Sequence, residues 1–243
     1  MNDVTDIINN AAKAIEAKAV SALNAELVPE FDDLLELRNL KGENTGYTKI
    51  YRGDGPSKIS SMSIDIKPGM ARYFNLQIVP DASLKLPRYV YEGMAMGHAS
   101  QVSVDLYPDM DMISNLDWIM KKYEGISEYF NTLRKEKPEF GFCVSRTIHM
   151  RTFASPVFLL APKISAEMLP DFESVAEWYF DYWLKMFSIA ETSDEAETEA
   201  RRQRRKIISD QTIALDPDRK MVTGVYGEEL TERIEEGAMY HAL

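Results

Sequence analysis

Glu92 is the side chain of this sequence whose surroundings most favour proton chemistry. It interrupts an aromatic, strand-like run, YVYEGM at residues 89–94. Burial among such neighbours favours the protonated form of a carboxyl, and a carboxyl that stays protonated near neutral pH can donate its proton. The alternative is that Glu92 projects outward from an edge strand.

Asp216 is a second candidate carboxyl. It lies in the helix-breaking tripeptide LDP, after a basic helical segment. An aspartate there commonly caps the helix that begins near Pro217. The residues alone leave both a capping and a proton-donating role open.

Few other side chains offer catalytic chemistry. Cys143 is the only cysteine, so the chain has no internal disulfide, multi-cysteine zinc site or protein-held iron–sulfur cluster. The three histidines lack the H-x-x-x-H spacing, and the sequence has neither G-x-G-x-x-G nor a Walker loop. We therefore expect no bound metal, nucleotide or dinucleotide.

The composition predicts an acidic globular protein. The 243 residues include 28 Lys and Arg against 39 Asp and Glu, which gives a net charge of −11. This charge argues against a nucleic acid or an anionic membrane as partner, so an anionic partner would need a local basic patch. The chain also lacks a secretory leader and an apolar run of about 20 residues, so we expect a soluble, cytoplasmic protein.

Helical periodicity is found near both ends of the chain. Apolar residues recur at helical spacing in 4–27 and 113–130, and a wide aromatic stripe spans 172–187. An acidic run then leads into a basic helix within 191–206. No linker or repeat interrupts the chain, so we expect one domain over 1–243.

Strands are expected between these helices. Two-residue alternation with short connections predicts a four-stranded antiparallel meander at 59–67, 71–80, 88–96 and 100–107. Two further apolar strands are expected at 142–151 and 156–161. The first two strands each have one apolar and one polar side, and the polar side would face water or a polar ligand.

Four short motifs follow one another at compatible spacing. They are FNLQIVP at 74–80, LPRYVYE at 86–92, VDLYP at 104–108, and LDPDR at 215–219 followed by YGE at 226–228. In this order they resemble motifs of the ferredoxin-dependent bilin reductases, from about Lys58 onward. The resemblance implies an α/β fold, a three-layer α/β/α sandwich with a central antiparallel sheet, and a linear tetrapyrrole between the sheet and the C-terminal helices.

The resemblance also implies an activity. The expected reaction is reduction of biliverdin to a phytobilin such as phycocyanobilin, by single electrons from an external reduced 2Fe–2S ferredoxin, each matched by a proton from the protein. The protein would hold no metal or flavin and would be a monomer or a homodimer. Because Glu92 replaces the usual Asp, as in the similar red chlorophyll catabolite reductases, the substrate could instead be a chlorophyll-derived open-chain tetrapyrrole. A non-catalytic bilin carrier is the other alternative.

Four residues match catalytic positions of the family. Glu92 falls on the catalytic Asp, and Asp216 falls on the C-terminal Asp. Asp65 occupies a third acidic position on a neighbouring strand. Asn75 falls where some members have His and others Asn.

The bilin propionates would need cationic or hydroxyl partners. The expected substrate-binding residues are Arg146, Arg151, Ser100 and Arg219. Surface salt bridges are the alternative for the arginines at 146 and 151.

The densest basic segment is the expected docking site for an acidic ferredoxin. It consists of Arg201, Arg202, Arg204, Arg205 and Lys206. The alternative is a solvated helix whose charges are balanced by the preceding glutamates.

Overall fold

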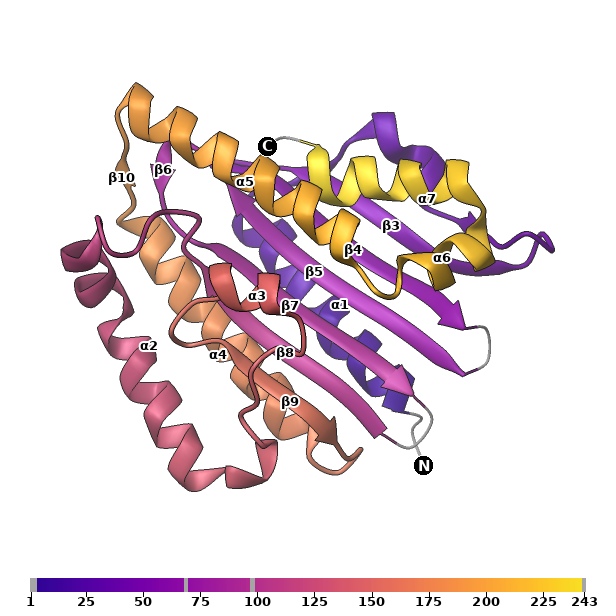
Figure 1. The fold of residues 1–243 in the computed structure, drawn as a ribbon, viewed down its shortest axis with the longest axis horizontal. Helices are drawn as coiled ribbons and strands as arrows, with labels where there is room; N and C mark the ends of the chain where they lie inside the picture. Colours follow the sequence, from indigo (N-terminus) through magenta and orange to yellow (C-terminus); the bar gives the residue numbers. More distant parts are fainter. Residues whose placement is uncertain (1–3, 68–69, 97–98, 242–243) are drawn as a thin grey trace.

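An antiparallel sheet lies between two layers of helices in the computed structural model, which describes residues 4–67, 70–96 and 99–241 (Figure 1). In spatial order its strands are β1 (Glu26–Leu27), β3 (Asn44–Arg52), β4 (Pro56–Lys67), β5 (Ala71–Pro80), β7 (Arg88–Met96), β8 (Ala99–Tyr107) and β9 (Leu159–Ile164), with β2 (Leu37–Arg38) paired to β3. The short strands β6 (Leu84–Lys85) and β10 (Glu191–Thr192) pair separately. The predicted α/β class and α/β/α layering are confirmed.

The helices divide between the two faces of the sheet. The first face, called the α1 face, is covered by α1 (Val4–Ala22) and α4 (Leu169–Ser188), with α2 (Leu116–Glu136) beside α4. The opposite face, called the α5 face, is covered by α3 (Ile148–Phe153), α5 (Glu195–Leu215), α6 (Arg219–Tyr226), α7 (Glu228–Glu235) and the helical turn η3 (Glu236–Tyr240). Short helical turns η1 (Pro29–Leu34) and η2 (Pro138–Phe140) join other elements. None of the helices in the described ranges is long and apolar enough to cross a membrane.

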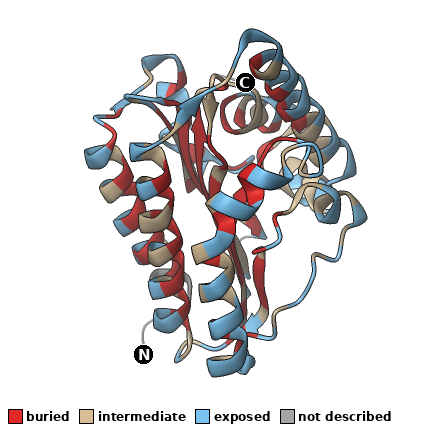
Figure 2. Cartoon of the chain, turned by 90° about the vertical axis from the view of Figure 1, so that its left-hand side faces the viewer, coloured by how far each residue is buried: buried red, intermediate tan, exposed pale blue. Residues whose placement is uncertain are grey.

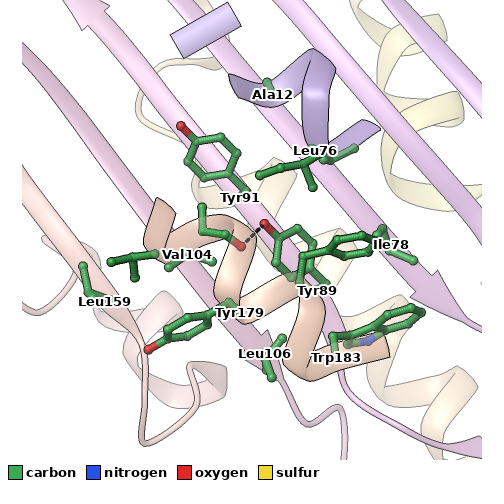
Figure 3. Close-up of a cluster of buried hydrophobic side chains, with 14 of the residues drawn as sticks. Ala12, Leu76, Ile78, Tyr89, Tyr91, Val104, Leu106, Leu159, Tyr179 and Trp183 are labelled. Atoms are coloured by element: carbon green, nitrogen blue, oxygen red, sulfur yellow. Dashed lines mark hydrogen bonds between the residues drawn. The ribbon is translucent and has the colours of Figure 1, made fainter. Parts of the chain in front are cut away.

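The larger core lies on the α1 face of β5, β7 and β8. Each helix there turns a buried stripe towards the sheet and an exposed side outward (Figure 2). Trp183 is fully buried, and its indole donates to the carbonyl of Pro87 at 2.7 Å. The Tyr89 hydroxyl donates to the carbonyl of Ala176 at 3.0 Å (Figure 3). These bonds satisfy the polar atoms of large aromatic residues whose burial stabilises the fold.

A smaller core lies on the α5 face of β3 and β4. Met62, Ile64 and Ile66 project from β4 and pack with Tyr226 and Ile234 of the C-terminal helices. The two cores therefore lie on opposite faces and over different strands.

The strand register explains this offset. Met62 is paired with Asn75, and Ser61 is paired with Leu76, so the polar side of β5 lies on the α5 face while the polar side of β4 lies on the α1 face. The sequence expectation of a polar side on each strand is confirmed, but the expectation that this side faces water or a ligand is wrong for β4, where Ser61 and Ser63 are buried against α1. The register adds that the two polar sides do not share a face.

The four-stranded meander is present as predicted, whereas some neighbouring predictions are wrong. The expected strand at 142–151 is an irregular segment followed by α3, and β3 was not expected. The helix expected over 4–27 ends at Ala22, and β1 follows it. The segment 142–151 pairs with no β8 residue in the described ladder, which β9 occupies instead.

Candidate functional site

A row of polar side chains crosses the α5 face of the sheet. Asn75 on β5 is paired with Glu92 on β7, which is paired in turn with Ser103 on β8. Side chains paired in this way point to the same face. Two of the predicted site residues, Asn75 and Glu92, are therefore neighbours.

Neutral donors hold the Glu92 carboxylate. The Tyr73 hydroxyl donates to Oε2 at 2.8 Å, and Nδ2 of Asn75 donates to the same oxygen at 3.4 Å. The Ser103 hydroxyl donates to Oε1 at 2.9 Å. Glu92 keeps partial solvent exposure, while Asn75 is buried. This arrangement can hold a carboxylate or accept a proton on it.

A hydrogen-bond chain extends along the sheet from Asn75. Its Oδ1 accepts from Nε2 of Gln77 at 2.9 Å, and Oε1 of Gln77 accepts from Nη1 of Arg88 at 3.5 Å. Arg88 and Arg205 both donate from Nε to Oδ2 of Asp109, at 2.7 and 2.9 Å. Burial opposes ionisation of Asp109, yet the two guanidinium groups hold its pKa below the usual value.

Asp216 lies at the C-terminal end of α5, in the layer above this row. Its Oδ1 accepts from the backbone N–H of Asp218 at 2.8 Å. The Asp216 residue is exposed at the surface, but desolvation by the groups packed around its carboxyl still raises its pKa above the usual value. Asp216 is also close enough to Tyr73 to contribute to the raised pKa of that phenol, after the larger effects of burial and of Glu92. The negative charges of Glu92 and Asp216 therefore both contribute to the raised pKa of Tyr73.

A cavity of about 440 Å³ lies between α5, α3 and the segment after β8. His149 and Phe153 of α3 line one side, and Arg204 and Ile208 of α5 line another. Asp109 contributes to the same wall. The cavity therefore meets the buried chain at the end opposite Glu92.

Two predicted residues do not join this site. Asp65 projects to the α1 face, where its carboxylate lies 3.5 Å from the guanidinium of Arg72. Ser100 is fully buried, and its hydroxyl donates to the carbonyl of Ile164 at 3.2 Å. Ser100 is paired with Ala95, which shares the α1 face with Tyr91. A ligand on the α5 face would not contact either side chain.

The three arginines predicted to bind substrate already have partners. Arg146 is exposed and lies 2.7 Å from Asp218, and Arg151 donates from Nε to the carbonyl of Ser145 at 2.7 Å. Arg219 forms a two-pronged ion pair with Glu235 at 2.6 and 3.0 Å. Arg146 is close enough to Asp216 to oppose the rise of its pKa, and its partner Asp218 follows Asp216 by two residues.

The predicted docking helix is divided between its two faces. Arg201 and Arg205 are each 2% exposed and point to the sheet, where Arg201 donates to the carbonyl of Ala82 at 2.8 Å. Residues four apart in a helix share one face, and here that face is buried against the rest of the protein. The prediction that these two arginines face a partner is therefore wrong. Arg202, Arg204 and Lys206 are exposed.

Several residues of the site were not predicted. Tyr73 and Gln77 flank Asn75 at two-residue spacing, and Ser103 and Asp105 show the same spacing on β8. Asp105 is buried, which raises its pKa to about 7, and it accepts from the backbone N–H of Ser155 at 2.9 Å. The period of two would have placed all of them on the α5 face, once Asn75 and Glu92 were assigned to it. Within residues 4–67, 70–96 and 99–241, no three His, Cys, Asp or Glu side chains are arranged to hold a metal ion.

Comparison with known proteins identifies the fold. No family model and no curated protein sequence matches the chain. Among solved structures, the crystal structure of phytochromobilin synthase from tomato in complex with biliverdin superposes with a TM-score of 0.82 at 14% sequence identity. The match covers 98% of this chain and 82% of the tomato chain. The predicted resemblance to the ferredoxin-dependent bilin reductases is therefore confirmed at the level of the fold, which this chain shares with phytochromobilin synthase.

Proposed function

We propose that this chain is a reductase of a linear tetrapyrrole with a reduced ferredoxin as external electron donor. The observation that supports it most strongly is the polar row centred on Glu92, which faces the layer that contains Asp216. A bilin held between them would have one carboxyl on each side. The fold shared with phytochromobilin synthase supports the same proposal.

The proposed reaction needs protons as well as electrons. Reducing one double bond of a bilin consumes two electrons, delivered singly by ferredoxin, and two protons, so the conversion of biliverdin to phycocyanobilin needs two such reductions, with four electrons and four protons in total. Each carboxyl that donates would take up a new proton from solvent between the two reductions. Glu92 and Asp216 would supply the protons, and Asn75 would orient the substrate, because a neutral amide can donate a hydrogen bond but is not a proton source. Arg146 would pair with a propionate in place of Asp218.

Biliverdin is the proposed substrate, and phycocyanobilin is the proposed product. The test is an anaerobic assay of protein, biliverdin and chemically reduced ferredoxin, followed by absorption spectroscopy and chromatography against bilin standards. Consumption of biliverdin with formation of a phytobilin is expected. A spectral shift on binding without consumption would indicate a carrier. Absence of binding would redirect the assay to chlorophyll-derived open-chain tetrapyrroles, which the Glu92 substitution favours.

Docking of ferredoxin would use the exposed side of α5. Changing Arg202, Arg204 and Lys206 together to Glu should raise the Michaelis constant for ferredoxin about tenfold and flatten its salt dependence, with bilin affinity unchanged. The matched control makes the same charge change on α2, at the exposed residues Lys121, Arg134 and Lys135. Equal effects of both triple variants would mean that net charge, not a docking surface, controls the encounter.

A further inference from the structure

We infer that Arg88 sets the direction of a hydrogen-bond chain that ends on Glu92, so that Tyr73 donates to Oε2 and the transferable proton of Glu92 is confined to Oε1. Arg88, Gln77 and Tyr73 are then positioning residues for proton transfer. The inference deepens the proposed function, and rests on it only where turnover is concerned.

The direction of the hydrogen bonds follows from which atoms of each side chain can donate and which can accept. A guanidinium has N–H donors and no acceptor, so the atom of Gln77 that faces Arg88 at 3.5 Å is its carbonyl oxygen. The amide nitrogen of Gln77 then faces Asn75 and donates to Oδ1 at 2.9 Å. Asn75 is left with its own amide nitrogen towards Tyr73, at 3.1 Å.

The orientation of the Tyr73 hydroxyl is fixed by its two hydrogen bonds. Its oxygen accepts from Asn75, and its single proton points to Oε2 of Glu92 at 2.8 Å. Asn75 and Gln77 are 5% and 7% exposed, so little water can replace these partners. Each donor in the series is polarised by the one before it, from the arginine to the carboxylate.

Oε1 is the oxygen on which Glu92 can carry a proton. Oε2 accepts two N–H or O–H groups that cannot turn away without breaking the chain. Ser103 lies 2.9 Å from Oε1, and a serine hydroxyl rotates to accept when that oxygen is protonated. On transfer, the Oε1–H bond breaks, the proton moves to the substrate and the carboxylate keeps its Tyr73 contact.

The hydrogen-bond partners of Glu92 are Tyr73 and Asn75 of β5 and Ser103 of β8. The further titratable groups of its surroundings are Tyr107 of β8 and Asp216 after α5. Arg88 of β7 is linked to Glu92 only through Gln77 and Asn75. Arg88 is compensated by Asp109, which it shares with Arg205. Tyr73 is not itself the proton source, because burial and Glu92 raise its pKa well above the usual value.

The isosteric variant Gln77→Glu tests the direction. Its carboxylate accepts from Arg88 and has no N–H for Asn75, so the Asn75 amide turns over and presents Oδ1 to Tyr73. The tyrosine proton then leaves Glu92. Protonation of Glu92 should move to higher pH by at least one unit, a tenfold change, through the lost donors and the added negative charge.

A double-mutant cycle separates these two causes. Tyr73→Phe alone should raise the pH midpoint of Glu92, but it should add nothing to Gln77→Glu, in which the hydroxyl already points elsewhere. A purely electrostatic effect of Glu at position 77 would add to that of Tyr73→Phe. Tyr91→Phe is the matched control, since the Tyr91 hydroxyl is buried on the opposite face without a described partner.

The measurement is infrared difference spectroscopy of the ligand-free protein across pH, with the Glu92 band assigned by its loss in Glu92→Gln. Non-additive shifts support the inference, and additive shifts or none overturn it. Should Gln77→Glu not fold, an unshifted band in Tyr73→Phe overturns it by itself. With biliverdin bound, the pH profile of bilin protonation should shift in the same direction. If the wild-type protein binds no biliverdin but the variants show the non-additive shifts, the proposed function is refuted while the inferred direction of the hydrogen bonds stands.

Discussion

Glu16 and Glu92 are carboxylates on opposite faces of one sheet, and each accepts from a tyrosine and a serine. Glu16 of α1 accepts from the Tyr51 hydroxyl at 2.6 Å and from Ser61. It also pairs with the Lys49 ammonium at 2.9 Å and is 5% exposed. In the described part of the chain, the partners of Glu92 are neutral, and its side chain stays partly accessible.

The two carboxylates differ in two respects: only Glu16 is paired with a cation, Lys49, and only Glu92 is partly accessible to solvent. A carboxylate paired with a lysine and sealed by a helix ties α1 to the sheet. A carboxylate held only by neutral donors can take up and release a proton without leaving an unpaired cation behind. The same types of donor therefore serve structure on the α1 face and would serve the proposed proton transfer on the α5 face.

Removing the Glu92 carboxyl should have the largest effect. Glu92→Gln cannot yield a proton at neutral pH, so proton-coupled reduction of biliverdin should fall at least about 10²-fold, with bilin affinity retained. Single-turnover absorption spectroscopy should show a half-reduced species that persists. Turnover at the wild-type rate would remove Glu92 from the mechanism.

Asp216→Asn should have the next largest effect. The amide oxygen can still accept from the backbone of Asp218, so the turn after α5 should be kept while the proton is lost. We expect about a 10- to 10²-fold loss of rate, with a different intermediate from Glu92→Gln. Rapid-scan spectra of the two variants decide this, and identical spectra would argue against separate roles.

Glu16→Gln should show the opposite signature. It leaves Lys49 without its charge partner beneath α1, so the free energy of unfolding should fall by about 2 kcal/mol. Reductase activity per folded molecule should not change. Urea denaturation with a parallel activity assay measures both, and Glu92→Gln serves as the reciprocal control. A Glu16→Gln protein that is stable but inactive would break the comparison.

Local patterns sufficed to predict much of the fold. The strands β4, β5, β7 and β8 each show apolar residues at two-residue spacing over much of their length, because one side of that stretch packs in a core. Strand β3 begins with Asn-Thr-Gly, which is a weak strand signal. The apolar side chains before α3 resemble a strand, but β9 takes the place beside β8, and this segment bonds to β9 through the backbone N–H of Cys143. Pairing partners are a tertiary property, so these errors could not be removed from the sequence alone.

The candidate site was partly predictable for the same reason. Asn75 and Glu92 were found through their motifs, and the register brings them together. Asp65 was placed with them through the family resemblance, as a third acidic position on a neighbouring strand, but which side of β4 meets which side of β5 is set by register. The spacing of four residues places Arg201 and Arg205 on one face of α5, but that this face is turned to the protein interior is again a tertiary property.

Glu173 of α4 is a third carboxyl of the sheet layers, and no described hydrogen-bond donor reaches its buried oxygen. Its Oε1 is buried and has no described partner, and burial alone raises the pKa of Glu173 to about 7. Its position near Tyr91 places it on the α1 face. Unlike Glu16 and Glu92, Glu173 has no described hydrogen-bond donor on its buried oxygen.

Glu173→Gln should therefore stabilise the protein in a pH-dependent way. The folded state prefers the protonated acid, so wild-type stability falls as pH rises from 4.5 to about 7 and stays reduced above that. Glutamine does not ionise, so the variant should match the wild type near pH 4 and exceed it by about 1 kcal/mol at pH 8, a value reduced for partial solvent screening. Chemical denaturation at both pH values measures the difference. An equal difference at both would show that Glu173 does not titrate in this range, and that a buried carboxyl in this fold needs neither cation nor donor.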